Sequence, residues 1–425
     1  MYFYGIIIVP HYNMKYLFTY LFVFISLNFF SQNDVEVLEP DYIKSIHLRA
    51  KKINAFVPVI RLGERFLFSF DDLEGDGKEY TYRLTHCTHD WEVSDVFSTE
   101  FIDGFNDDTI RNYENSFNTH QDYTHYELQI PNQSMRIKIS GNYIISILDD
   151  SEEVIFTRRF IVYQKKVDVG ISMHKARKID AIKTKQNVEL FINYPNLKIN
   201  NPSEEIKIAI YKNNDWNNVI TNIKPQYFRG TQLLYKYGEK TTFFGGNEFL
   251  NFDTKDYRTA TNNIRHVALK DVYETYLYTD ISRESFTYTH YPDINGNFFL
   301  RTVNAENIKT EGDYTNIHFI YKSNNIKDNE EVYVYGAFND WQFTEENKLT
   351  LSGDNYYETT ILLKQGFYNY TYVTLDADEN INHTLEGTHY QTENDYTIIV
   401  YYSKFGAKYD QVIGYGVGNS VNLQN

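Results

Sequence analysis

The chain has 425 residues, of which 57 are acidic and 41 basic, so its formal net charge is −16. This charge argues against non-specific binding to DNA or RNA and against a polybasic anchor on a membrane surface, because both need clustered Lys and Arg. The length predicts about three domains. The 39 Tyr and 30 Phe favour β-strands, where large side chains cover half-buried surfaces.

The N-terminus is typical of a secretory signal peptide. From Met14 the sequence "MKYLFTYLFVFISLNFFSQ" has one lysine, an apolar stretch and then small polar residues. We therefore expect residues 1–32 to be a signal peptide with Met14 as the true start, and a retained anchor is the alternative. No later segment is apolar over the length of a bilayer span, so we do not expect an integral membrane protein.

Short alternating segments follow along most of the chain. They include "RFLFSF" (65–70), "NYIISIL" (142–148), "IKIAIY" (206–211), "NIHFIY" (316–321) and "YNYTYV" (368–373). Clusters of Asn, Asp and Gly separate them, as in "LEGDGKE" and "LSGDN". This pattern predicts an all-β protein built from tandem immunoglobulin-like β-sandwich domains.

Composition suggests where the domains begin and end. We expect an N-terminal β-sandwich at 33–165, a middle β-rich domain at 166–290 and a C-terminal immunoglobulin-like domain at 291–405. The Gly-rich residues 406–425 are expected to form a poorly ordered tail. The three tryptophans, Trp91, Trp216 and Trp341, each follow an Asp, and they are 125 residues apart. This spacing agrees with three modules, although coincidence explains it nearly as well.

The sequence "THCTHDW" (85–91) concentrates reactive side chains around the one cysteine. If the segment is a strand, Cys87, His89 and Trp91 share one face. Zinc needs three or four protein ligands, and further ligands would have to come from His120 or His125. We expect Cys87 to be a small buried residue beside Trp91, with no metal and no cofactor. A metal-dependent hydrolase around Cys87 and His89 is the alternative.

Two further motifs have a structural and a functional interpretation. "YPDINGN" (291–297) lacks the glycine and glutamate positions of a calcium loop, and its Asn-Gly favours a hairpin turn. "FFGGNEFLNFD" (243–253) is either a bulge or turn, or a contact loop that carries Asn247 and Glu248. No serine elbow and no evident carboxylate pair occurs, so we do not expect an enzyme.

The third module suggests another function. "VYVYGAFNDW" (332–341), followed by an apolar strand and a Tyr-rich strand, is similar to immunoglobulin-like modules that bind α-glucans. Their exposed Trp residues stack on sugar rings, and Trp341 occupies the matching position. The alternative function is therefore an exported carbohydrate-binding protein that acts through Trp341.

The motifs taken together resemble one family over residues 60–414. They are "FSFDDL", "YTYRLTHCTHDWEVSDVFSTEFIDGF", "NSFNTHQDYTHYELQIPN", "ISGNYII", "FGGNEFLNFD", "DINGNFFLR", "DYTNIHFIY", "VYVYGAFNDW", "LLKQGFYNYTYV", "TENDYTIIVYY" and "KYDQVIG". In this order they resemble the plug proteins of the type IX secretion system of the Bacteroidota. The resemblance implies a non-enzymatic periplasmic protein, peripheral at the outer membrane, which binds the β-barrel translocon and closes its pore when no cargo is engaged.

The resemblance supplies no set of contact residues. Loop aromatic and polar groups in the two sharpest motif regions are the candidates for partner binding. They are Trp91, Phe105, Tyr123, Tyr126, Asn247 and Glu248. We expect the free protein to be monomeric.

Overall fold

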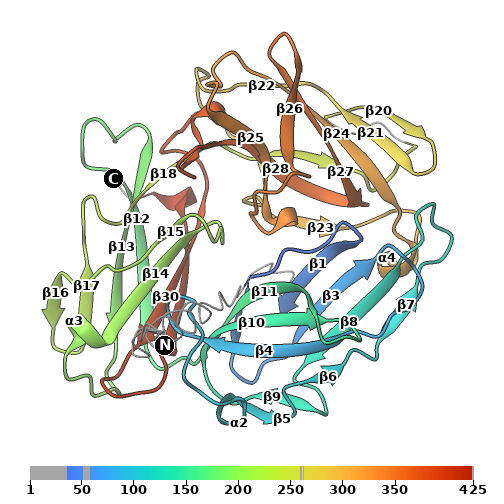
Figure 1. The fold of residues 1–425 in the computed structure, drawn as a ribbon. Coiled ribbons are helices and arrows are strands. Elements are labelled where there is room, and N and C mark those ends of the chain that lie inside the picture. Colours follow the sequence, from blue (N-terminus) through green and yellow to red (C-terminus); the bar gives the residue numbers. More distant parts are fainter. Residues whose placement is uncertain (1–35, 51–57, 259–260, 262, 424–425) are drawn as a thin grey trace, which may run out of the picture.

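The computed structural model describes residues 36–50, 58–258, 261 and 263–423, and the expected signal peptide lies outside these residues. The described chain forms three β-units (Figure 1), and the prediction of an all-β protein with tandem β domains is confirmed. The helices in this part of the chain have only three or four residues each. None of the helices found there has the length and apolarity to cross a membrane.

Two sheets enclose the core of the first sandwich. One sheet has the order β1 (Ile43–Ala50), β3 (Phe66–Asp72), β8 (Thr124–Ile130) and β7 (Tyr113–Asn115). The other has the order β2 (Val59–Arg61), β11 (Val154–Tyr163), β10 (Gly141–Leu148), β4 (Thr81–Cys87) and β6 (Asp108–Thr109). The short elements α2 (Ser98–Phe101), β5 (Ile102–Gly104) and β9 (Met135–Ile137) complete this unit. Alternation places aromatic rings between the sheets: Phe70 stacks on Tyr126 at 5.0 Å and meets Phe156 edge-on at 5.2 Å.

The second sandwich combines strands from two distant parts of the chain. Its first sheet contains β12 (Asp168–Lys175), β13 (Lys185–Asn193), β16 (Tyr227–Arg229), β17 (Gln232–Tyr235) and β18 (Thr242–Phe244). Its second sheet has the order β15 (Val219–Ile220), β14 (Ile206–Lys212), β30 (Asp395–Tyr402) and β31 (Gln411–Asn419). The short helix α3 (Pro202–Glu205) precedes β14.

The segment expected to be a poorly ordered tail contains β31. Gly414, Gly416 and Gly418 alternate along this strand and lie against β12 and the residue before it. A Cβ atom at Gly414 would lie 2.4 Å from Val167 Cγ2. The glycines therefore permit a close approach between strands, and the expectation of poor order is wrong for this strand.

The third unit is a single eleven-stranded sheet that folds over its own core. The main path contains β19 (Leu250–Asp253), β28 (Gly366–Asp376), β25 (Glu330–Tyr335), β26 (Lys348–Gly353), β27 (Tyr356–Lys364), β24 (Tyr314–Lys322), β21 (Tyr273–Leu277) and β20 (Ile264–Leu269). The additional strands are β22 (Asp280–Ile281), β23 (Phe298–Leu300) and β29 (Ile381–Asn382). Phe252 of β19 meets Phe319 of β24 at 5.9 Å, so distant parts of the sheet share one core.

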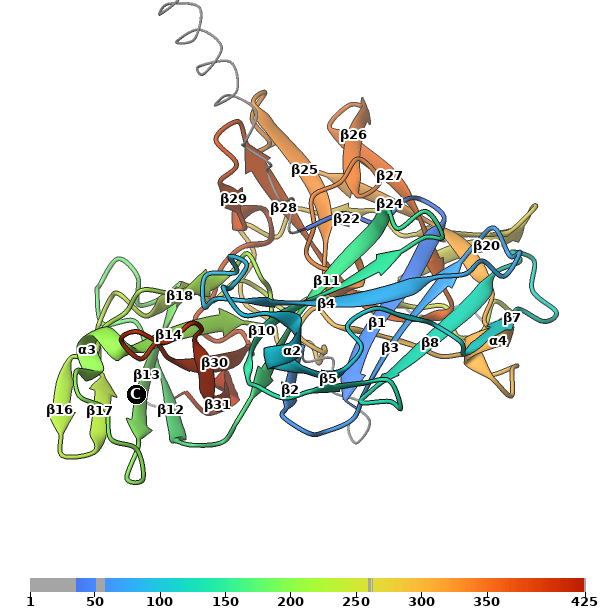
Figure 2. The same cartoon turned by 60° about the horizontal axis from the view of Figure 1, so that its bottom comes forward.

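The third unit is inserted into the second. The chain leaves the second sandwich after β18, builds the strands β19 to β29, and returns to pair β30 with β14 over seven residue pairs. In Figure 1 the red strand β30 lies beside the green strand β14. In Figure 2 the strands β25 to β29 of the third unit stand above the other two units. The boundaries at 290 and 405 therefore do not coincide with these sheets, because the third sheet begins at β19 and the second sandwich ends with β31.

Candidate functional site at the junctions of the three units

A buried ion pair joins the first unit to the third. The Asp71 side chain is fully buried. Its Oδ2 atom accepts hydrogen bonds from Lys364 Nζ and from the Tyr314 hydroxyl, each at 2.7 Å. His125 Nδ1 lies 2.6 Å from Oδ1. Burial alone would raise the pKa of Asp71, but the Lys364 charge and the His125 hydrogen bond hold it below its ordinary value. The carboxylate therefore stays charged and ties strands β3, β24 and β27 together.

Tyr123 lies at the same junction. Its hydroxyl donates to the Gly312 carbonyl oxygen at 3.0 Å, and Lys364 Nζ lies 3.9 Å from the centre of its ring. The Tyr314 ring meets it edge-on at 5.4 Å. The structure thus places this predicted partner-binding residue in an internal contact, where its ring supports the buried lysine.

A histidine and an aspartate join the first unit to the second. The backbone N–H of His89 donates to Asp410 Oδ2 at 2.9 Å, and His89 Nδ1 lies 2.9 Å from the same atom. Burial alone would raise the pKa of Asp410, but the hydrogen bonds from His89 and Ser403 hold it well below its ordinary value. Nearby, the Tyr401 hydroxyl donates to Asn142 Oδ1 at 3.0 Å.

The three Asp-Trp motifs converge where the units meet. Trp91 and Trp216 lie edge to face, with ring centres 5.3 Å apart, and Trp216 also packs in the apolar cluster that contains Trp341. The Arg159 guanidinium lies 5.0 Å from the Trp91 ring. Trp341 is only 4% exposed, so its ring has no free face for a sugar. The hypothesis of sugar stacking on Trp341 is therefore wrong for this conformation, since the residue packs inside the junction.

Polar contacts also join the second unit to the third. The Tyr335 hydroxyl donates to Asp215 Oδ1 at 2.8 Å, and Asn217 Nδ2 donates to the Trp341 carbonyl oxygen at 2.7 Å. Burial raises the pKa of Asp215 to about 7. Lys212 Nζ donates to the carbonyl oxygens of residues 244 and 245, and burial lowers its pKa to about 8.

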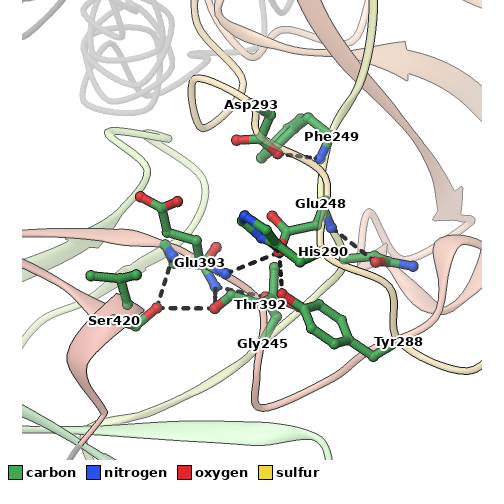
Figure 3. A network of polar contacts seen from close by, with 12 residues as sticks. Gly245, Glu248, Phe249, Tyr288, His290, Asp293, Thr392, Glu393 and Ser420 are labelled. Carbon is green, nitrogen blue, oxygen red and sulfur yellow. Dashed lines mark hydrogen bonds and ion pairs between the residues drawn. The ribbon is translucent and has the colours of Figure 1, made fainter.

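A second network centres on Glu248, which is almost fully buried (Figure 3). Its Oε1 atom accepts from the Tyr288 hydroxyl and from the Glu393 backbone N–H, and His290 Nδ1 lies 3.4 Å away. Asn247 Nδ2 donates to the carbonyl oxygen of residue 386 at 2.7 Å. These contacts come from three separate segments, so the predicted residues Asn247 and Glu248 bind the protein's own loops.

The acid next to this network is also buried. Asp293 Oδ2 accepts the Phe249 N–H at 2.5 Å, and Oδ1 accepts the Asn295 N–H at 2.8 Å. Burial raises the pKa of Asp293 to about 7, and the nearby Glu248 charge adds to this effect. The "DING" motif therefore forms a turn whose acid caps backbone donors, in agreement with the turn interpretation.

Gly245 explains the paired glycines of "FFGGNEF". A Cβ atom at Gly245 would lie 1.9 Å from the His389 carbonyl oxygen and 3.3 Å from that of Thr184. Gly246 has a φ of +72°, which favours glycine. The pair therefore permits two loops to cross closely at the seam between the second and third units.

The last two predicted contact residues lie in opposite environments. Tyr126 is in the core of the first sandwich, and its hydroxyl donates to the Lys78 carbonyl oxygen at 2.8 Å. Phe105 is 74% exposed in the loop after β5. Of the predicted set, Phe105 is therefore the side chain most available to another molecule.

Cys87 is fully buried, as expected, and burial raises the pKa of its thiol to about 12. The strand ends at Cys87, and Trp91 has a φ of +68°, so the expected continuation of one face through His89 and Trp91 is wrong. Among the described residues, no group of three or more His, Cys, Asp or Glu side chains is arranged to hold a metal ion. The two side chains on which the hydrolase alternative rests are engaged within the protein, since Cys87 is buried and His89 contacts Asp410.

Sequence reasoning missed the charged residues that link the units. Asp71 and Lys364 stand at the ends of the apolar segments "RFLFSFD" and "TTILLK", and Arg158 interrupts another strand. Arg158 pairs with Glu39 at 2.8 Å and with Asp340 at 3.4 Å. A charged residue inside or directly after an apolar strand was the available signal, because such residues are rarely buried without a partner.

The geometry defines a class of protein: a set of β-units fixed to each other by buried polar contacts. The family model described as type 9 secretion system plug protein 1st domain matches residues 43–164. The crystal structure of a hypothetical protein from Parabacteroides merdae ATCC 43184 aligns with a TM-score of 0.87 and 30% identity. The alignment covers 90% of this chain and 98% of that one. This chain belongs to the type 9 secretion system plug protein family.

Two other comparisons add nothing to this assignment. Trypsin-activated alpha-2-macroglobulin from Escherichia coli aligns with a TM-score of 0.18 and 10% identity, which carries no argument. A search of the curated proteins finds no match. The family assignment therefore depends on the match of residues 43–164 to the family model.

Proposed function

We propose that this protein is a non-enzymatic periplasmic plug, peripheral at the outer membrane, that binds the type IX translocon and occludes its pore when no cargo is engaged. The match of residues 43–164 to the plug family carries this proposal. The family indicates association with the secretion machinery, and the proposal adds the translocon as the partner and pore closure as the consequence.

The junctions support a role as a stopper. A plug has to keep its shape while it blocks an opening, so its units must not swing about their linkers. The buried Asp71–Lys364 pair, the His89–Asp410 contact and the Tyr335–Asp215 hydrogen bond each connect two different units. Moving the units apart would expose these groups without their partners, which is costly for buried charges.

An exposed aromatic patch supports a docking surface beside Phe105. Phe97 and Phe105 are 73% and 74% exposed, and they flank α2 and β5 of the first sandwich. The turn between β30 and β31 lies against this region, because Lys408 Nζ is 2.9 Å from Glu100 Oε1 and 5.6 Å from the Phe97 ring centre. Exposed aromatic side chains are favoured anchors in protein interfaces. We propose that this patch, the aromatic patch, contacts the translocon.

Affinity purification from native cell envelopes tests the proposal. An epitope tag inserted between Asp354 and Asn355 would lie in the exposed turn that joins β26 to β27. We expect a giant outer-membrane barrel to co-purify, with more of it when cargo is depleted. Recovery of the tagged protein alone under both conditions would refute translocon binding.

A matched pair of variants tests the aromatic patch. Phe105→Ser should reduce barrel recovery, whereas Phe117→Ser, which changes a similarly exposed phenylalanine in another loop, should not. Equal recovery with both variants would remove the aromatic patch from the proposal and leave the plug function standing.

A further inference from the structure

The turn between β12 and β13 has a charge opposite to that of the whole chain. Residues 175–185, "KARKIDAIKTK", contain five basic residues and one acidic residue, a net charge of +4 in a chain with −16. We call this segment the basic turn. The whole-chain charge argued against a polybasic surface, but an average over 425 residues does not describe this one turn.

Hydrogen bonds give the basic turn a defined shape. The Ala176 N–H donates to the Lys185 carbonyl oxygen at 3.2 Å, and the Lys185 N–H donates to the Ala181 carbonyl oxygen at 2.8 Å. The Ala181 N–H donates to the Lys178 carbonyl oxygen at 3.1 Å. The backbone therefore holds Ile179 at the tip, where its side chain is 92% exposed.

Apolar and cationic groups lie together around this tip. Ile182 is also exposed, and Phe244 of β18 is 50% exposed in register with Lys185. Lys185 Nζ lies 4.1 Å from the Phe244 ring centre, and Lys175 Nζ lies 4.4 Å from that of Tyr390. The surface therefore combines a projecting aliphatic side chain, an aromatic ring and several ammonium groups.

Much of the positive charge is not neutralised by neighbours. Arg177 pairs with Glu189, and Lys178 pairs with Glu239 at 2.8 Å. In the part of the chain that the structure describes, no carboxylate lies within ion-pair distance of Lys175, Lys183 or Lys185. These ammonium groups thus remain available to external anions.

We propose that the basic turn binds the surface of an anionic phospholipid membrane, with Ile179 inserted among the acyl chains and the lysines on the phosphate groups. Basic side chains beside anionic lipid and an apolar group at the interface stabilise membrane binding together. An acidic protein is the less suitable occupant, because protein interfaces favour aromatic and Arg anchors in pockets over a projecting isoleucine. This binding does not depend on the translocon, so it goes beyond the plug function.

Vesicle co-sedimentation of the purified mature chain tests the proposal. We expect binding to vesicles of mixed neutral and anionic phospholipid, little binding to purely neutral vesicles, and weaker binding at high salt because salt screens exposed charges. Ile179→Ser should lower the partition coefficient about tenfold or more, since burial of one isoleucine supplies that factor. Lys183→Glu should also lower binding to the anionic vesicles.

A matched control separates this turn from any exposed apolar tip. Phe405 is 95% exposed in the turn between β30 and β31, and Lys404 and Lys408 flank it. Phe405→Ser should leave vesicle binding unchanged, and melting curves of both variants should match that of the unmodified protein. Absence of binding to anionic vesicles at low salt, or equal losses in both serine variants, would overturn the proposal.

The same vesicles distinguish this proposal from the plug function, because they contain no barrel. Cross-linking at Lys183 to an acidic envelope protein, together with no vesicle binding, would assign the surface to that protein and refute the lipid proposal. Loss of barrel co-purification with intact vesicle binding would instead refute the plug function alone.

Discussion

Replacement of Lys364 by methionine tests whether buried charge holds the units together. Methionine has a similar length but leaves Asp71 without its cation, while Tyr314 and His125 still contact the carboxylate. Breaking one side of a buried ion pair costs about 3–5 kcal/mol. For a cooperative unit of 150–250 residues this corresponds to a lower melting temperature by roughly 10 °C.

Thermal unfolding followed by circular dichroism measures this effect. The double variant Asp71→Asn/Lys364→Met removes both charges and should recover more than half of the loss, because no unpaired charge remains. Lys322→Met, at an exposed position on β24, is the control and should change stability by less than about 0.5 kcal/mol. Equal melting temperatures for Lys364→Met and Lys322→Met, or additive losses in the double variant, would refute the reasoning.

Three further predictions concern buried groups. The pKa of Asp293 is raised to about 7, so the folded state holds an extra proton from about pH 4 to 7 and loses stability as the pH rises through that range. The free energy of unfolding of Asp293→Asn, measured in urea, should therefore rise relative to that of the unmodified protein as the pH goes from 5 to 8. A difference between the two free energies that does not change with pH would contradict this. Gly245→Ala should cost about 1–3 kcal/mol because its Cβ meets the His389 backbone, whereas Gly238→Ala, whose Cβ would lie 3.9 Å from the Arg177 side chain, should cost much less by the same assay. Cys87 should react with a thiol reagent only after unfolding, and rapid labelling of the native protein would show that its burial is transient.

The alternation of the strands could be predicted because each unit buries one face of each strand. Segments such as 65–70 and 142–148 became β3 and β10, and their inward residues form the first core. The family resemblance could also be recognised, since its motifs are strands and their adjoining loops in a fixed order. These features depend on residues close together in the sequence.

The contacts between units could not be predicted in the same way. Asp71 and Lys364 are 293 positions apart, and nothing local indicates that one charged residue would meet the other. Trp91 and Tyr123 were candidates for partner binding, and Trp341 was the candidate for sugar binding in the alternative function. An aromatic side chain in a loop has the same local sequence whether it binds another molecule or packs against a neighbouring unit. The glycines of β31 predicted a poorly ordered tail for a related reason. They permit the close approach of β12, which is distant in the sequence.

The insertion of the third unit determines when the protein is complete. Strand β14 ends at Lys212, but its neighbour β30 starts at Asp395, so one edge of β14 stays unpaired until nearly half of the chain has been synthesised after it. An unpaired strand edge invites aggregation, which makes a holding chaperone valuable during this interval. A chain that stops before Asp395 lacks two strands of an inner unit rather than a dispensable end. The second sandwich can therefore fold correctly only after β30 and β31 have been synthesised, which makes its folding depend on residues 395–419.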